Sequence, residues 1–122
     1  MRKVFALTTI VLLAGIMFAQ DKTVTLDGYL MDNACAESAK DIGARAKTHS
    51  VSCSLMDGCE KSGYAVFAGE KLYKLDDKGN ASAEELLKNT KTKKGVHVKV
   101  EGTVDGDTVK VSKLTEVMEA IN

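Results

Sequence analysis

The sequence has 122 residues, the length of a single domain. Its 17 basic and 17 acidic residues balance, so charge gives no reason to expect nucleic acid or an anionic membrane surface as a partner. With no tryptophan and few aromatic residues, the core must be filled mainly by Val, Leu and Ala, and a disulfide or a metal ion would help to stabilise so small a domain.

The beginning of the chain has the pattern of a secretory signal peptide. Arg2 and Lys3 precede an uncharged, mostly apolar stretch from Val4 to Phe18, and Ala19 offers a small residue for cleavage. A retained membrane anchor is the alternative, but the apolar stretch is shorter than the roughly 20 residues that span a bilayer.

Cleavage after Ala19 would divide the chain into a signal peptide, residues 1–19, and one domain, residues 20–122. Losing Arg2 and Lys3 leaves 15 basic and 17 acidic residues, a net charge of −2. We therefore expect a periplasmic or secreted protein with no stable membrane span after cleavage and no nucleic acid partner. The sequence does not identify any other partner.

Thr23 to Met31 reads as the first strand. Val24, Leu26 and Leu30 fall on one face at a period of two residues, which is typical of a half-buried strand. Gly28 interrupts this face and predicts a bulge or bend that allows the strand to pair on both sides.

The segment from Asp32 to Gly63 differs in character, because it holds all three cysteines and shows little alternation. Ala34 to Lys47 suits a short helix or a loop. Ser50 to Ser62 predicts a helix that Ser50 caps and that Gly63 ends in the left-handed conformation.

Strand chemistry returns from Tyr64 to Leu75, where Gly69-Glu70 separates two apolar runs and predicts a hairpin. Asp76 to Asn80 is a cluster of turn-forming residues. The capping box that begins at Ser82 predicts a short helix over Ala83 to Asn89.

The strongest hairpin pattern follows. Val96 to Val104 alternates cleanly, the turn residues Asp105 to Asp107 follow, and Val109 and Val111 resume the alternation. We expect Glu116 to Asn122 to form a polar or helical tail.

This order of elements predicts a mainly β protein with short helices. Five strands with a helix between the third and fourth match the order of a five-stranded OB-fold barrel, here with a Cys-rich helical insertion at about residues 32–63, between strands one and two. An open α+β sheet built from the same elements is the alternative.

Five motifs in succession carry a resemblance to a known family: Gly28–Cys35, which contains Asp32-x2-Cys35, then His49-x3-Cys53-x5-Cys59, Gly63–Phe67, Lys71–Leu75, and the valine-rich hairpin after Gly95. This succession resembles a family of small exported bacterial proteins of unknown function with an OB-like barrel, over nearly the whole mature chain. The resemblance implies no activity. Many related-looking sequences have a histidine shortly after the first cysteine. Here Ala, Glu and Ser follow Cys35, so that ligand is absent or replaced by His49.

The residues that suggest a site are Cys35, His49, Cys53 and Cys59, because thiolate and imidazole are the ligands that suit zinc or copper. If the second helix reaches back to His49, His49 and Cys53 share a face. Cys59 would point away from that face unless the helix breaks, and Gly58 could supply the break.

Asp32 and Met56 are possible accessory residues of this metal site. Asp32 is expected chiefly as a helix N-cap, and Met56 lies near the face of Cys53. Three thiolates with one imidazole would suit structural zinc, whereas sulfur ligands with His49 and Met56 would favour Cu(I).

The alternative is a disulfide-cross-linked interaction domain that binds no metal, in which two of Cys35, Cys53 and Cys59 pair. A third possibility is that the thiols stay free or react by redox chemistry, although no C-x-x-C motif supports exchange. Since no catalytic constellation is recognisable, we do not expect an enzyme.

Overall fold

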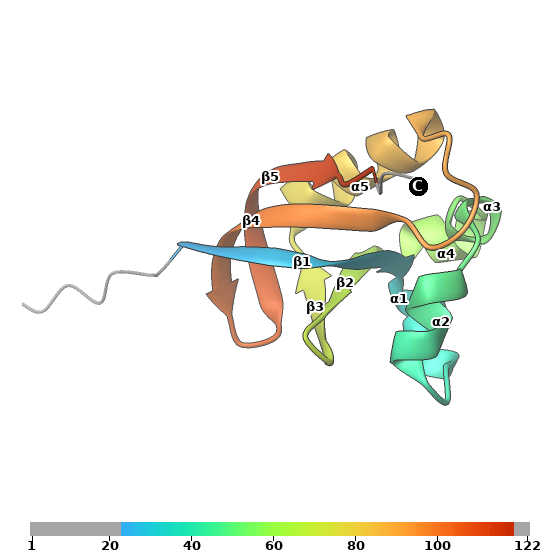
Figure 1. Cartoon of the computed structure of the whole chain (residues 1–122), viewed down its shortest axis with the longest axis horizontal. Helices are drawn as coiled ribbons and strands as arrows, with labels where there is room; N and C mark the ends of the chain where they lie inside the picture. Colours follow the sequence, from blue (N-terminus) through green and yellow to red (C-terminus); the bar gives the residue numbers. More distant parts are fainter. Residues whose placement is uncertain (1–22, 119–122) are drawn as a thin grey trace, which may run out of the picture.

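The computed structural model describes residues 23–118, and the predicted signal peptide lies outside them. One closed sheet with the strand order β1-β2-β3-β5-β4 dominates the fold (Figure 1). Its strands are β1 (Thr23–Asp32), β2 (Tyr64–Ala68), β3 (Lys71–Leu75), β4 (His97–Asp105) and β5 (Thr108–Glu116). The expectation of a mainly β protein with short helices is confirmed, and so are both predicted hairpins.

Closure of the sheet is uneven. β1 pairs with β4 over Thr23–Tyr29 and with β2 over Tyr29–Asp32, so it has neighbours on both sides as the sequence predicts. A Cβ at Gly28 would lie 2.2 Å from the Phe67 carbonyl oxygen, which is why glycine is needed where β1 meets β2. β3 and β5 are parallel and pair at only two positions, whereas β4 and β5 form a long antiparallel ladder.

The main core lies inside the closed sheet. The predicted inward face of β4 is confirmed, because Val98 and Val100 are fully buried there. Ala83 and Leu87 of helix α5 (Asp77–Asn89) add to this core. A second, smaller cluster around Met31 and Ala46 packs helices against the other face of β1.

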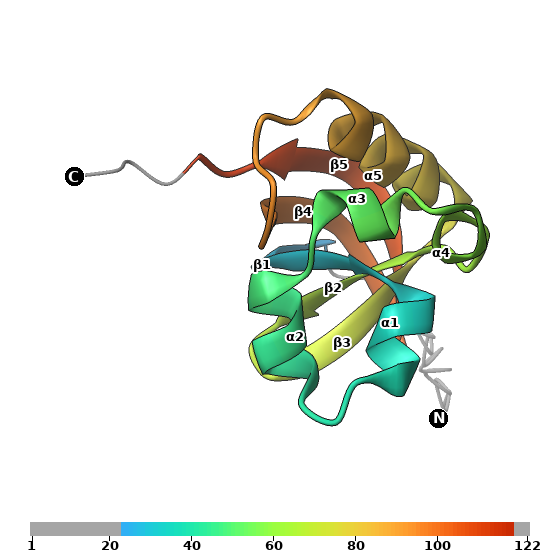
Figure 2. The ribbon, with the colours of Figure 1, turned by 90° about the vertical axis from the view of Figure 1, so that its right-hand side faces the viewer.

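Four short helices fill the segment between β1 and β2 and lie together at one end of the sheet (Figure 2). They are α1 (Asn33–Ser38), α2 (Ile42–Thr48), α3 (Val51–Ser54) and α4 (Asp57–Lys61). The predicted single helix over Ser50–Ser62 is wrong, because the backbone of Met56 is extended and separates α3 from α4. The predicted Ser50 cap and the left-handed Gly63 (φ 81°) are confirmed.

Helix α5 begins earlier than the sequence predicts. The Asp76 carboxylate accepts a hydrogen bond of 2.9 Å from the backbone N–H of Gly79, so the expected turn over Asp76–Asn80 is instead the capped first turn of the helix. Within the described residues, no helix is long and apolar enough to cross a membrane.

Candidate metal site

Asp32 stands where β1 ends and α1 begins. Its Oδ2 accepts a hydrogen bond of 2.8 Å from the backbone N–H of Cys35, which is the N-cap arrangement that the sequence predicts. The residue is 0% exposed, which is unusual for a carboxylate and requires compensating partners.

His49 is the main partner. Its Nε2 lies 2.6 Å from Oδ1 of Asp32, and both side chains are buried. Ser54 adds a longer contact of 3.4 Å from its hydroxyl to the same carboxylate oxygen. His49 lies between α2 and α3 with extended backbone, so the helix does not reach back to it and the condition for a shared face with Cys53 is not met. The reason is local, because Ser50 caps α3 and the first helical residue is Val51, two residues after His49.

These contacts set the charge of Asp32. Burial alone raises the pKa of the carboxyl, but hydrogen bonds from His49 and from Cys35 hold it well below its usual range. Asp32 is therefore an anion at neutral pH, enclosed in the protein.

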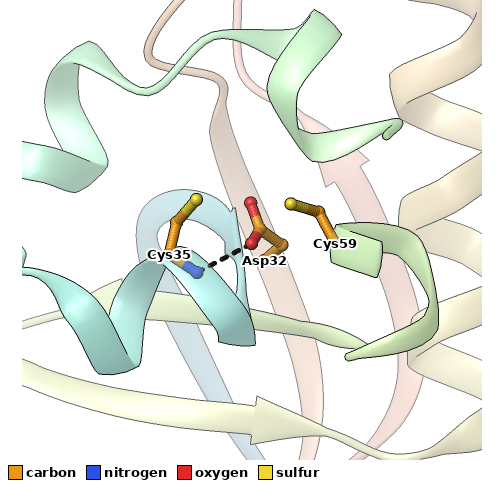
Figure 3. Close-up of side chains that lie close together, drawn as sticks. All are labelled: Asp32, Cys35 and Cys59. Atoms are coloured by element: carbon orange, nitrogen blue, oxygen red, sulfur yellow. Dashed lines mark hydrogen bonds between the residues drawn. The ribbon is translucent and has the colours of Figure 1, made fainter. Parts of the chain in front are cut away.

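Two thiols converge on this anion. The ligand atoms of Asp32, Cys35 and Cys59 all lie within 4.8 Å of one another, and the carboxylate appears between the two sulfurs in Figure 3. Cys35 and Cys59 are half-buried free thiols. A fully buried carboxylate and the thiols of two half-buried cysteines thus share one small volume.

Hydrogen bonds from the backbone and from two side chains hold α1 and α4 together and so position the two cysteines. The Asn33 backbone N–H donates to the Gly63 carbonyl (2.9 Å), and the Asn33 side chain donates to the Ser62 carbonyl (2.9 Å). The Ser62 hydroxyl accepts from the Ala34 backbone N–H (3.1 Å) and donates to the carbonyl of Cys59 (2.6 Å). The start of α1 and the end of α4 are therefore tied side by side.

The surroundings keep both thiols protonated. Burial and then the charge of Asp32 raise the pKa of Cys35, where a hydrogen bond from Arg45 acts in the opposite direction. The same two causes raise the pKa of Cys59 to about 11. Two neutral thiols beside a carboxylate form a set that becomes strongly anionic once the protons leave, and a cation would stabilise that form.

The structure brings together only part of the set that the sequence suggested. Cys35 and Cys59 meet at Asp32, and His49 reaches the same carboxylate from its other oxygen. Cys53 is exposed on α3, and Met56 is 61% exposed, so neither side chain belongs to the cluster of Asp32, Cys35 and Cys59. Asp32, expected only as an accessory residue, lies at the centre.

Comparison of the chain with protein-family models, curated proteins and solved structures finds no match. The functional evidence is therefore the donor set itself. Thiolate sulfur and carboxylate oxygen are both zinc ligands, and a tetrahedral ion with Zn–S bonds of about 2.3 Å places two sulfurs about 3.8 Å apart. Since the sulfurs of Cys35 and Cys59 already lie within 4.8 Å, an approach of about 1 Å or less would bring them to that spacing.

Proposed function

We propose that the chain is a small exported metal-binding module, and that Asp32, Cys35 and Cys59 bind a zinc ion. The observation that carries the proposal is the convergence of one carboxylate and two thiols within 4.8 Å. Once the two thiols lose their protons, they and the Asp32 carboxylate repel one another, and a bound cation would offset that repulsion.

The donor types favour zinc over copper. Cu(I) prefers soft sulfur and imidazole ligands, whereas a carboxylate is hard and suits Zn²⁺ better. The sequence left both metals open on the basis of thiolate and imidazole ligands, with Met56 as a possible accessory ligand for copper. In the structure Cys53 and Met56 are exposed and lie outside the cluster. Three protein donors leave one position of a tetrahedral ion for water or for an incoming ligand.

His49 acts in this proposal as a positioning residue. Its hydrogen bond of 2.6 Å to Oδ1 fixes the orientation of the Asp32 carboxylate from the side opposite the N-cap contact. Residues that orient a metal ligand in this way commonly change metal affinity about 10- to 100-fold when they are mutated.

We also propose that the closed sheet is an OB-type barrel and that the chain is exported from the cytoplasm. The closed strand order β1-β2-β3-β5-β4, with α5 between β3 and β4, supports an OB-like topology with the metal site in the insertion after β1. The basic and apolar residues that precede Ala19 support passage to the periplasm or the exterior.

A second candidate function rests on the same pair of sulfurs. In an oxidising compartment, Cys35 and Cys59 lie close enough to pair after a small movement, which would give a disulfide-cross-linked interaction domain that needs no metal. Cys53 would remain as an exposed free thiol in that form.

Metal content and thiol count on one sample separate the two functions. The chain is expressed from its full sequence, reduced, loaded with Zn²⁺ and dialysed, and the bound metal is measured by elemental analysis. We expect about one zinc per chain, retained in Cys53→Ser, which serves as the matched control, and lost in Cys35→Ser and Cys59→Ser. A reduced, folded chain that binds no zinc would refute the metal function, and protection of Cys35 and Cys59 from alkylation before reduction would then support the disulfide form.

A further inference from the structure

The proposed zinc ion and a disulfide would compete for the same two atoms. The Sγ atoms of Cys35 and Cys59 lie within 4.8 Å of each other, and both lie within that distance of Asp32. If the sulfurs form a bond with each other, Asp32 is the single strong donor left in the cluster. One carboxylate is a weak zinc site compared with a carboxylate and two thiolates.

We propose that the site is a redox switch, in which thiol–disulfide exchange joins Cys35 to Cys59 and expels the metal ion. This inference rests on the proposed metal-binding function and assigns a regulation to it. The oxidant is a small-molecule disulfide such as oxidised glutathione, and a dithiol reductant reverses the step.

The exchange takes place in two steps. One cysteine thiolate attacks a sulfur of glutathione disulfide, which forms a mixed disulfide and releases one glutathione thiolate. The second cysteine thiolate then attacks the protein sulfur of that mixed disulfide, forms the Cys35–Cys59 bond and releases the second glutathione. The protein loses two electrons, glutathione disulfide gains two, and Zn²⁺ leaves with its charge unchanged.

Burial differs across the site in a way that suits this chemistry. Asp32 is 0% exposed, whereas Cys35 and Cys59 are only half-buried, so the two cysteines lie nearer to the surface than the carboxylate does. Cys59 lies in α4, a helix of five residues whose N-terminus has no side-chain cap. The two sulfurs must approach by up to about 2.8 Å, from 4.8 Å or less to the bond length of about 2.05 Å, and a short element of this kind is the part that would move.

Cys53 provides a control within the same chain. It is exposed on α3 and is not among the three clustered donors. Glutathione disulfide should therefore modify Cys53 without affecting the metal, and Cys53→Ser should remove that modification and leave the switch intact.

The test uses the full chain and its Cys53→Ser variant, both reduced and loaded with Zn²⁺. Each is treated with an excess of oxidised glutathione while a chromogenic indicator reports free zinc. Intact mass and peptide mapping then identify the bonds that form. We expect zinc release in step with a mass loss of two hydrogen atoms in Cys53→Ser, a peptide that links Cys35 to Cys59, and recovery of zinc binding after reduction.

Other outcomes would overturn the inference in distinguishable ways. Zinc that stays bound while only Cys53 gains glutathione would refute the switch and leave the metal function standing. A disulfide that joins Cys53 to either of the other cysteines would also refute the switch. A reduced chain that never binds zinc would refute the metal function and the switch with it, even if Cys35 and Cys59 become linked.

Discussion

Replacing His49 by alanine tests the buried network that fixes Asp32. The substitution removes the Nε2 donor that lies 2.6 Å from Oδ1, while both side chains are at most 3% exposed. Asp32 would keep the N–H of Cys35 at 2.8 Å and the long Ser54 contact at 3.4 Å. Leaving a buried polar group without a hydrogen-bond partner costs about 1–3 kcal/mol and more when the group is charged, so we expect a loss of about 3 kcal/mol. This is a large share of the roughly 5–15 kcal/mol that stabilises a small domain.

The loss should also depend on pH. Because the folded-state pKa of Asp32 is lowered, its contribution to stability is fully present above the unfolded pKa of about 4. It declines as the pH falls below that value and is lost as the pH falls through the folded-state pKa. Without His49 the folded pKa rises toward the unfolded value, so the variant loses less stability on acidification. The difference between wild type and His49→Ala should therefore narrow between about pH 5.5 and about pH 3.

Urea unfolding of the metal-free chains in the presence of a chelator measures both effects. His49→Gln is the matched control, because its amide nitrogen can take the place of Nε2 and donate to Asp32. We expect it to recover a substantial part of the lost stability. A His49→Ala variant destabilised by less than about 1 kcal/mol, or by the same amount at both pH values, would refute the reasoning.

Three further measurements test the reactivity of Cys59, the pairing of Cys35 with Cys59 and the packing around Gly28. The pKa of Cys59 is raised to about 11, so its alkylation by iodoacetamide should be slow at neutral pH and accelerate about tenfold per pH unit up to about pH 11. Peptide mass spectrometry measures the rate, and a rate that levels off near pH 8 would contradict the raised pKa. A Cys35–Cys59 disulfide closes a loop of about 25 residues and should stabilise the metal-free chain by about 3.5 kcal/mol. Urea unfolding of oxidised and reduced Cys53→Ser measures the difference in the free energy of unfolding, and no difference would count against native-like pairing. Gly28→Ala should prevent folding or strongly destabilise the protein, because the added Cβ would lie 2.2 Å from a backbone oxygen. Gly58→Ala has open space around the added Cβ and should be nearly neutral in thermal unfolding. Equal effects of the two substitutions would contradict this placement of Gly28.

The sequence predicted the elements whose signals are local. Alternation located β1, the two hairpins and the buried face of β4, and the spacing of Ser50 and Asp32 to the following residues identified two helix caps. The start of α5 was missed because the sequence of residues 76–80 suits both a turn and a capped first helical turn. The close packing of Gly79 against Val111 is a tertiary contact that favours the helical turn.

The site was only partly predictable for a different reason. Asp32 and Cys35 are linked by a local N-cap, so their spacing in the sequence carries the signal. Cys59 comes close to them because the helix is interrupted at Met56 and because Asn33 forms hydrogen bonds to Ser62 and Gly63. These hydrogen bonds are tertiary contacts, which the spacing of residues in the sequence does not predict. Cys53 precedes this break and stays exposed on α3, outside the cluster.

Isothermal titration of Zn²⁺ into the reduced, metal-free chain tests the central claim most directly, with Cys59→Ser and Cys53→Ser titrated alongside. The account predicts a single site in the wild type and in Cys53→Ser, and at least about 100-fold weaker binding in Cys59→Ser, since a thiolate ligand is lost. Equal zinc affinity in Cys59→Ser and the wild type, or a loss of affinity confined to Cys53→Ser, would contradict it.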